Sequence, residues 1–557
     1  MNKEERYDFV IIGGGHNGIT AAAYLAKSGQ SVCVLEERSE CGGAVENTEP
    51  IPGVRIDSHA TSMYAGAAPG FDQLELWKYG FRMDWSTPPG GTDIEETKRE
   101  GVLTTEGVVP LTDMDILGLA KITGLLSDPP FARELLRAIY WCPPHPLEVE
   151  VTAENIPYMQ VYKQYAPDIW TEELLDMTLF ELMDQYCETE AFKVQMAIVA
   201  WYSGAAPHWE GVAIPSLGGA LCPIYSRASV PKGGMHTYTH AIVRCAIAHG
   251  AVMRTCCPVD EIIIHEGRAV GVRLRETATW GEKTIWANKA VVSAMDVQQT
   301  FLKLIGPQHL DVSFIQWIKD LSLKGGSYYV SHFLFREPPR FRPKFKGREG
   351  QVAAGFYPCD SRELFYEHLM DIDGRKGSPS VPPERVIWIA IDYHKYNPSV
   401  RIPDRYLVSP FYVQVPPPEY HVEGPDAISK IKEKWDAYML EAYSQVAENA
   451  EPPNLVAQWS NTPYENEFRN AGLIGGNWSG TRHCKDQLWT DRLLPELSRY
   501  RVPFIDGLYL CHQTSGHPGG LCIMAVPYNL MHILIEDGLV EPGDWWYPSP
   551  WYIPEQG

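Results

Sequence analysis

The sequence predicts an α/β protein whose first domain is built on a parallel sheet, and three observations at its N-terminus support this class. An apolar segment at residues 9–12 runs into a glycine-rich turn. An alanine-rich, helix-forming segment follows up to residue 26. A second apolar segment at residues 31–35 then ends in an acidic residue. Strand, turn, helix and strand in this order form a βαβ unit with parallel strands.

The turn has the pattern G-x-G-x-x-G, formed by Gly13, Gly15 and Gly18. In this pattern the first glycine permits the tight turn, the second lets the backbone approach a pyrophosphate, and the third lets the helix pack close to the strand. His16 and Asn17 stand at the start of the helix, where the helix dipole favours a diphosphate. These five residues therefore predict a dinucleotide site.

The second strand ends at Glu36, about 20 residues beyond the glycines, where a carboxylate binds ribose hydroxyls. Glu37, Arg38 and the pair Gly42-Gly43 follow, and we assign them to the same site. NAD and FAD both use this fingerprint. A basic residue and a Gly-Gly turn here favour the long, extended FAD, as does a second glycine-rich segment at 517–520 before an apolar helical run.

Four blocks spread over the chain carry a resemblance to known proteins: residues 13–26; residues 231–235 with 250–255 and 259–262; residues 498–503; and residues 507–511 with 517–520 and 528–529. They resemble the phytoene desaturase-like flavoproteins of the amine oxidase-like FAD superfamily, and most closely the pyridine nucleotide-disulfide oxidoreductase domain 2-like branch. The resemblance implies a Rossmann-type FAD-binding domain with an inserted mixed α+β substrate domain over the flavin. It also implies that Val259, His517, Gly519 and Gly520 contact FAD.

The chain departs from the family pattern near its C-terminus. His512 stands where the family has glycine, and one extra residue separates Cys511 from His517. Leu521, Met524 and Pro527 also replace glycines. Bulky residues there should change how closely the backbone approaches the flavin, which leaves the reaction type open.

The expected FAD-binding domain has three pieces, at 1–85, 225–300 and 470–557, the last including a C-terminal tail. The middle piece predicts a helix over 234–250, strands over 251–254 and 291–294, and a β-ribbon formed by 259–265 and 269–275. The insertions at 86–224 and 301–469 are rich in proline and aromatic residues, and they form the expected substrate domain.

Two histidines are candidates for catalysis as proton acceptors, since imidazole titrates near neutral pH. His59 lies in residues 55–61, which resemble the family's strand beside the flavin, and His512 lies in the altered C-terminal turn. Residues 328–333 alternate like a strand, so Tyr328 and His332 share one face and are candidates for substrate binding. Arg469, Arg482 and Arg492 either neutralise a phosphate or substrate carboxylate, or form surface salt bridges.

The composition disfavours several classes of protein, namely those that bind nucleic acid, anionic membranes or metal ions. The net charge of −22, from 48 basic and 70 acidic residues, disfavours nucleic acid and anionic membranes. The 12 cysteines show no C-x-x-C spacing, so we expect free thiols in a cytoplasmic protein, with no metal site. Residues 116–139 predict a buried helix, with membrane contact as the alternative. No run approaches the ~18–20 apolar residues of a membrane span.

These features together predict an FAD-dependent dehydrogenase or desaturase of a largely apolar small molecule, of isoprenoid or alicyclic type. Oxygen, a quinone or another carrier would accept the electrons. Two alternatives stay open: a flavin-dependent isomerase or hydratase without net redox change, and a non-catalytic flavoprotein that acts as an interaction subunit. The sequence does not predict an oligomeric state.

Overall fold

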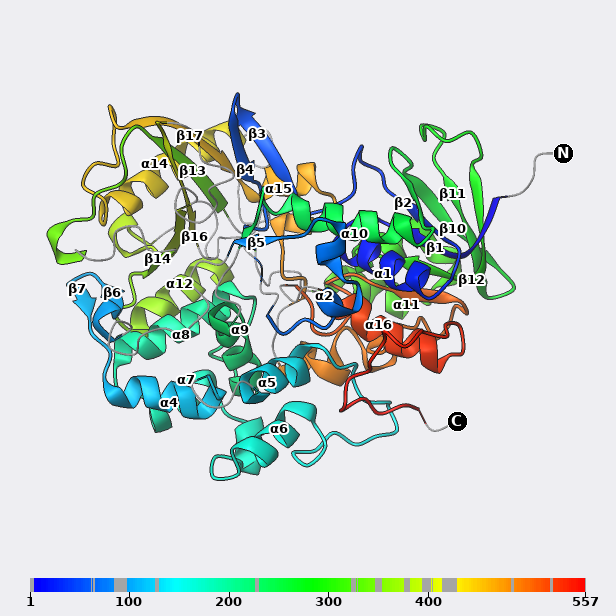
Figure 1. The fold of residues 1–557 in the computed structure, drawn as a ribbon, viewed down its shortest axis with the longest axis horizontal. Helices are drawn as coiled ribbons and strands as arrows, with labels where there is room; N and C mark the ends of the chain where they lie inside the picture. The colour runs from blue at the N-terminus through cyan, green and yellow to red at the C-terminus, as the bar shows by residue number, and fades with distance from the viewer. Residues whose placement is uncertain are drawn as a thin grey trace.

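The computed structural model describes residues 5–61, 63, 66–84, 98–125, 130–225, 230–321, 327, 329–345, 353–374, 381–392, 402, 404–412, 428–481, 485–520 and 524–555. Figure 1 shows two halves side by side, each built on its own sheet. The first strand and the last helix lie in the same half, together with both ends of the chain. The other half contains segments from the middle of the sequence.

The first half is organised around a sheet of seven strands within the described residues. In order across the sheet these are β10 (Val259–His265), β11 (Arg268–Leu274), β12 (Thr284–Ser293), β1 (Glu5–Ile12), β2 (Val32–Leu35) and β9 (Val252–Arg254), while β18 (Leu508–Leu510) pairs with the end of β12. The pairs β12–β1, β1–β2, β2–β9 and β12–β18 are parallel, whereas β10, β11 and β12 form an antiparallel ribbon.

Both faces of β1 are buried because different helices cover them. Phe9 and Ile11 pack into the core that includes α1 (His16–Lys27), α10 (His236–Ala248) and α16 (Ala525–Glu536). Val10 and Ile12 pack into a second core with the π-helical segment η3 (Gln299–Ile305) and α11 (Val312–Asp320). Continuous burial explains why this strand reads as an uninterrupted apolar run.

The second half contains an antiparallel sheet in the order β14 (Ala353–Tyr357), β15 (Trp388–Asp392), β16 (Tyr406–Tyr412), β13 (Tyr329–Phe335) and β17 (Leu455–Asn461). Its helices are α4 (Asp113–Thr123), α5 (Pro130–Tyr140), α6 (Pro157–Tyr165), α7 (Leu179–Tyr186), α8 (Glu190–Tyr202), α9 (Ala213–Tyr225), α12 (Arg362–Gly374), α14 (Ile428–Ser444) and α15 (Pro463–Arg469). In Figure 1 the helices from α4 to α9 lie below this sheet.

Shorter elements include α2 (Gly70–Gln73) and the strand pairs β3 (Asn47–Ile51) with β4 (Val54–Asp57), β5 (Met83–Asp84) with β8 (Val230–Pro231), and β6 (Val102–Thr104) with β7 (Gly107–Val109). None of the helices in the described ranges has both the length and the apolar character that crossing a bilayer would require.

The predicted fold class is confirmed, and most predicted elements of the first half are present. The helix expected over 234–250 is α10, and the expected ribbon is β10 with β11. Two expectations need correction. Residues 116–139 form two helices, α4 and α5, instead of one. Residues 301–320, expected in the substrate domain, pack against the dinucleotide sheet, which extends the first half to about residue 320.

Candidate functional site

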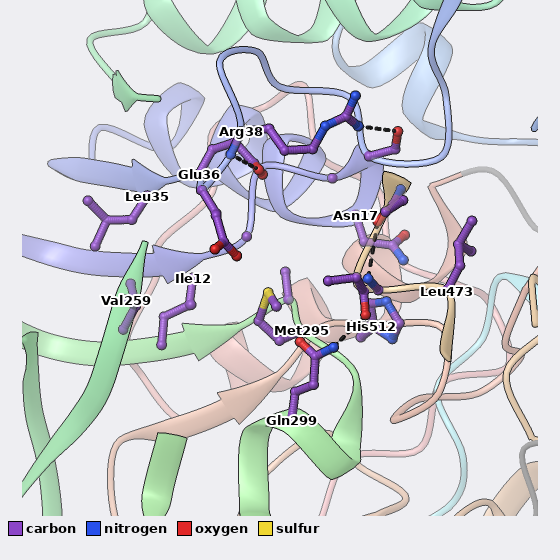
Figure 2. Close-up of a pocket in the computed structure, with 18 of the residues that line it drawn as sticks. Ile12, Asn17, Leu35, Glu36, Arg38, Val259, Met295, Gln299, Leu473 and His512 are labelled. Carbon is purple, nitrogen blue, oxygen red and sulfur yellow. Dashed lines mark hydrogen bonds between the residues drawn. The ribbon is translucent and has the colours of Figure 1, made fainter. Parts of the chain in front are cut away.

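A cavity of about 560 Å³ opens at the carboxyl ends of β1 and β2, where parallel α/β sheets bind their ligands. Figure 2 shows Glu36, Met295 and His512 around this space, each from a different segment. The wall is formed by the turn after β1, the end of β2 and its following loop, the start of β10, the segment after β12, η3, and residues 468–473 and 512–513. The cavity thus joins all three predicted pieces of the dinucleotide domain.

The first and third glycines of the motif act as predicted. Gly13 has φ +96°, and its N–H donates to the Leu35 carbonyl at 2.9 Å, which closes the turn. A Cβ atom at Gly18 would lie 2.1 Å from the Gly13 carbonyl oxygen. The helix therefore approaches the turn at a distance that only glycine permits.

The middle glycine, Gly15, is needed because a side chain there would enter the space beside the N-terminus of α1. Gly15 has φ −65°, a value open to any residue, so its backbone conformation does not require glycine. A Cβ atom here would meet only the Gly43 Cα, at 3.9 Å. Gly43, at φ +59°, faces it, and the Gly42 N–H donates to the Gly14 carbonyl at 2.9 Å. Two glycine backbones thus border an open cradle beside the N-terminus of α1, and a diphosphate fits this cradle.

Glu36 lies at the end of β2, as predicted, and its carboxylate lines the cavity. One oxygen accepts the Gly14 N–H at 2.7 Å and the other accepts the Arg38 N–H at 2.8 Å. Burial raises the pKa of Glu36, and these two hydrogen bonds oppose that rise. Each carboxylate oxygen keeps a lone pair for a ribose hydroxyl. Val259 lines the same end of the cavity and supplies an apolar surface.

Side chains around this cavity supply positive charge to a chain that is acidic overall. Arg38, Arg275, Lys303 and Arg469 all line it, and Glu37 at the rim pairs with Arg275 at 3.1 Å. His16 and Asn17 also line the wall at the start of α1. Burial lowers the pKa of His16 to about 4, so its imidazole is neutral near pH 7. The arginines and Lys303 bring positive charge to the wall, and ion pairs of the arginines with Glu37, Glu46 and Asp260 offset part of it.

The buried carboxylate of Glu46 lies next to three predicted site residues, Arg38, His59 and Arg469. Its side chain is 1% exposed and forms ion pairs with Arg38 and Arg469, while His59 Nε2 lies 3.4 Å from its carboxylate. Burial would raise the pKa of Glu46, but hydrogen bonds from His59 and Arg469 and the nearby charges lower it to about 2. Glu46 was not among the site residues predicted from the sequence. An acidic residue just after the apolar pair Ala44-Val45 was the available signal.

His512 lies in the cavity, with Nε2 facing Gly472. Its Nδ1 accepts the Thr514 N–H at 3.2 Å and lies 2.9 Å from the Thr514 hydroxyl. The neutral ring therefore carries its proton on Nε2, and burial lowers the pKa to about 3. This arrangement makes His512 a hydrogen-bond donor to the cavity and a poor proton acceptor.

His59 and His332 lie near each other, outside the described lining of this cavity. Burial lowers the pKa of both imidazoles, and charge on His59 would lower that of His332 further, to about 3. His332 on β13 bonds to the Ser409 hydroxyl at 2.6 Å and stacks on Trp459. Tyr328 lies outside the described residues. The roles assigned to these side chains stay predictions.

The segment 517–520 makes contacts within the protein, and its contact with FAD stays a prediction. His517 Nε2 donates to the Ile139 carbonyl at 2.8 Å, at the end of α5, and burial lowers its pKa to about 3. Gly520 packs against the backbone of Ser479, and Gly519 takes φ +91°. The last carbonyls of a helix need donors, and His517 supplies one of them.

The structure also shows the positions of other C-terminal residues that were discussed from the sequence. Arg492 is fully buried and donates to the Gln513 carbonyl at 2.5 Å, so it supports the turn instead of a ligand. Met524 takes φ +62°, a conformation typical of the glycine that it replaces. Pro527 is buried in α16. Arg482 and Leu521 lie outside the described residues.

Comparison with known proteins agrees with this site. A family model for the NAD(P)-binding Rossmann-like domain matches residues 11–75. Pyridine nucleotide-disulfide oxidoreductase domain-containing protein 2 of Rattus norvegicus is 27% identical over 95% of this chain and 94% of its own length. This chain is a homologue of that protein, within the amine oxidase and phytoene desaturase-like superfamily of FAD-binding Rossmann proteins.

Two further proteins are similar to this chain over nearly its whole length. A limonene dehydrogenase subunit of Castellaniella defragrans is 24% identical over 98% of this chain and 97% of its own length. The solved structure of putrescine oxidase bound to putrescine shares the fold, with a TM-score of 0.54 at 14% identity, and the match covers 96% of this chain and 100% of that one. The chain is thus similar over nearly its whole length to proteins of the flavin-dependent oxidoreductase superfamily.

Proposed function

We propose that the chain binds FAD as its tight cofactor and dehydrogenates a largely apolar small molecule. The observation that carries this proposal is the extent of the cavity. It runs from Glu36 and Val259, past the cradle that Gly15 and Gly43 border, to Gly472 and His512. A site with a ribose carboxylate at one end and polar groups beyond the diphosphate cradle suits an extended dinucleotide with a second ring system.

Each part of the wall has a separate task in this proposal. Glu36 binds the ribose hydroxyls, while the N-terminus of α1 and the cradle hold the diphosphate. At the end of the cavity opposite Glu36, the Nε2–H of His512 would donate a hydrogen bond to the cofactor. Bound FAD would supply flavin N5 as the hydride acceptor for a substrate C–H. The remaining tasks, orienting the substrate and excluding water, belong to the surrounding side chains.

We place the apolar substrate in the region where the two halves of the molecule meet. On β13, Val330 and Leu334 belong to the same core as α1 and α10, whereas Tyr329, Phe333 and Phe335 face the opposite core. The second half therefore presents an apolar face toward the dinucleotide half. The name of the limonene dehydrogenase relative supports an alicyclic or isoprenoid substrate. The electron acceptor would be oxygen, a quinone or another carrier.

The cofactor is tested by denaturing the purified protein and separating the released compound by chromatography. We expect FAD. Recovery of only nicotinamide dinucleotide from fully occupied protein would contradict the proposal.

The reaction is tested by adding monocyclic terpenes to the oxidised holoenzyme without oxygen. We expect substrate-dependent bleaching of the flavin, with a charged substrate such as putrescine as the negative control. Turnover without net bleaching would support the isomerase or hydratase alternative. Neither bleaching nor turnover with a broad apolar panel would favour a non-catalytic interaction subunit.

A further inference from the structure

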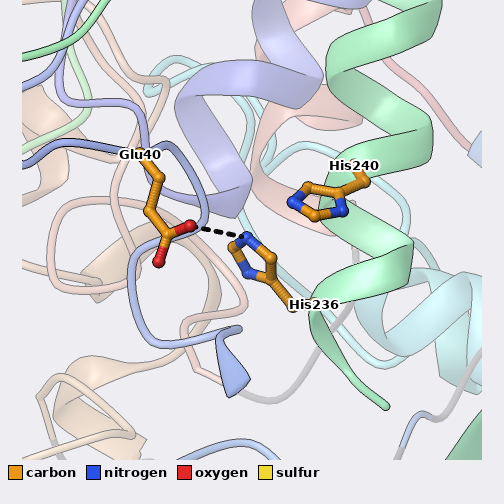
Figure 3. Close-up of side chains that lie close together, drawn as sticks. All are labelled: Glu40, His236 and His240. Atoms are coloured by element: carbon orange, nitrogen blue, oxygen red, sulfur yellow. Dashed lines mark ion pairs between the residues drawn. The ribbon is translucent and has the colours of Figure 1, made fainter. Parts of the chain in front are cut away.

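Three potential ligand side chains meet outside the dinucleotide cavity. His236 is the first residue of α10, His240 lies one turn later on the same face, and Glu40 comes from the loop after β2. One ligand atom from each lies within 4.8 Å of the others. Figure 3 shows the Glu40 carboxylate and the His240 ring on two sides of His236. Glu40 and the two histidines are about 200 positions apart in sequence, so spacing alone gave no metal signal.

The His236 ring is held in the orientation that a metal ligand needs. The residue is 7% exposed, and Nδ1 donates to the Val45 carbonyl at 2.9 Å. The lone pair of the neutral ring is therefore on Nε2. This atom is buried without a hydrogen-bond partner and lies 3.5 Å from Glu40 Oε2. Histidine ligands of metals characteristically give their other N–H to a carbonyl or carboxylate in this way.

The arrangement of the two rings and the carboxylate also suits a cation. The two rings pack edge to face with their centroids 4.1 Å apart. Two imidazoles that bind through nitrogen lone pairs, together with one carboxylate, would give a ligand set with a single negative charge.

A simple ion pair is the competing explanation. It requires a protonated His236 beside Glu40, whose side chain is 51% exposed. An ion pair with one partner so exposed contributes little to stability. It also gives no role to the second imidazole, whose ring centroid lies 4.1 Å from that of His236.

We propose that Glu40, His236 and His240 bind a late first-row divalent cation, with zinc as the physiological ion and water in the remaining position. Imidazole and carboxylate ligands suit zinc, cobalt(II), nickel(II) and copper(II). The ion would tie α10 to the loop after β2. That loop packs directly on His236, since a Cβ atom at Gly42 would lie 2.8 Å from His236 Cε1. The metal would therefore brace Gly43, which forms one side of the diphosphate cradle.

The test uses full-length protein with its own cofactor and without a polyhistidine tag, after treatment with a chelator. Zinc chloride is titrated calorimetrically into the wild type, His240→Ala and Glu40→Gln, whose altered side chains are exposed and should leave the fold intact. His309→Ala removes another exposed histidine and serves as the control. We expect one zinc per chain, weakened at least ~10-fold in the two cluster variants and unchanged in the control.

Two measurements distinguish metal coordination by the cluster from electrostatic attraction of zinc to the protein. Cobalt(II) bound to the wild type should give a visible spectrum distinct from that of aqueous cobalt, and His240→Ala should lose it. Zinc should also raise the Tm of the wild type but not of His240→Ala. If all four proteins bind zinc equally, or if cobalt keeps its aqueous spectrum, the cluster is an ion pair and the proposal is wrong. None of these readouts depends on the proposed reaction.

Discussion

Gly15 and Gly18 stand three positions apart in one motif, yet substitutions should fail for different reasons. Gly15→Val should fold, because φ −65° is allowed and the added atoms enter open space, but it should weaken dinucleotide binding roughly 100-fold by filling the cradle. Gly18→Ala should cost about 3 kcal/mol of stability, because its Cβ meets a backbone oxygen. Thermal unfolding and cofactor content of the two variants check this contrast.

Glu36→Ala is the comparison within the same cavity. It removes hydrogen bonds to the ribose without blocking the cradle, so it should retain more cofactor than Gly15→Val. Equal retention by Gly15→Val and the parent would show that the turn is not a phosphate loop.

Glu46 should be needed because it neutralises two arginines beside the cavity. Its pKa of about 2 lies below the ordinary value of 4.5, so ionised Glu46 stabilises the fold above pH 4.5, and this stabilisation is lost as the pH falls toward 2. The shift corresponds to about 3 kcal/mol at neutral pH. Glu46→Gln should lose stability of this order in urea unfolding at pH 7, and the difference from wild type should shrink only below pH 4.5.

Glu37→Gln is the matched control for Glu46→Gln, since Glu37 belongs to the same loop but is exposed. Similar losses in the two variants would contradict the role assigned to the buried carboxylate.

His512 should act as a hydrogen-bond donor and not as a base. With a pKa of about 3 it stays neutral between pH 5 and pH 8, so it should contribute no limb to the pH profile of flavin reduction in that range. His512→Gln can keep an N–H donor and should retain most of the reduction rate. A drop of ~10²–10⁴-fold in both His512→Gln and His512→Ala, with loss of a limb near neutral pH, would restore the general-base role.

At the scale of elements, the C-terminal turn serves as a cap for a helix in the other half. The carbonyls of Ile139 and Tyr140 at the end of α5 accept from His517 and Asn529, respectively. His517→Ala leaves one buried carbonyl unpaired, which should cost about 1–3 kcal/mol. Because its ring lies away from the dinucleotide cavity, FAD content should change little. Stability and cofactor content of His517→Ala, measured beside His512→Ala, check this separation.

The elements that the sequence predicted well are those set by local pattern. The strand, turn and helix from β1 to α1 follow from an apolar run, three glycines and an alanine-rich segment. The ribbon of β10 and β11 follows from two short apolar segments separated by Glu266-Gly267. The order of the second sheet did not follow, because β13 pairs with β16 and β17, which are more than 70 residues away along the chain.

In the site, too, residues within a local motif could be predicted, whereas residues with partners far away in the sequence could not. Gly13, Gly15, Gly18 and Glu36 follow a motif with fixed spacing, so they could be placed from sequence. One partner of Glu46 is Arg469, 423 positions later, and no spacing rule predicts such a contact. The direction of the His517 ring depends on α5, an element of the inserted domain.

At the scale of the whole molecule, buried neutral histidines should make stability depend on pH. His332, His517 and His532 are at most 4% exposed, and burial lowers the pKa of each to about 3. His532 shows the reason most clearly. Its Nδ1 donates to the Tyr528 carbonyl at 3.0 Å, and its Nε2 accepts the Ser549 N–H at 2.9 Å, so added protons would break a bond.

The direction of this dependence follows from the depressed pKa values. Above pH 6.5 these histidines are neutral in both the folded and the unfolded chain. Below pH 6.5 only the unfolded chain takes up protons, so folding stability falls as the pH falls. At pH 5.5 the three residues together should cost up to about 4 kcal/mol. We expect the Tm of the whole protein to fall steeply between pH 6.5 and pH 5. His532→Phe should reduce the slope, whereas the exposed His265→Ala should leave it unchanged. A Tm that is flat over this range, or the same slope in all three proteins, would show that the buried imidazoles accept protons in the folded state.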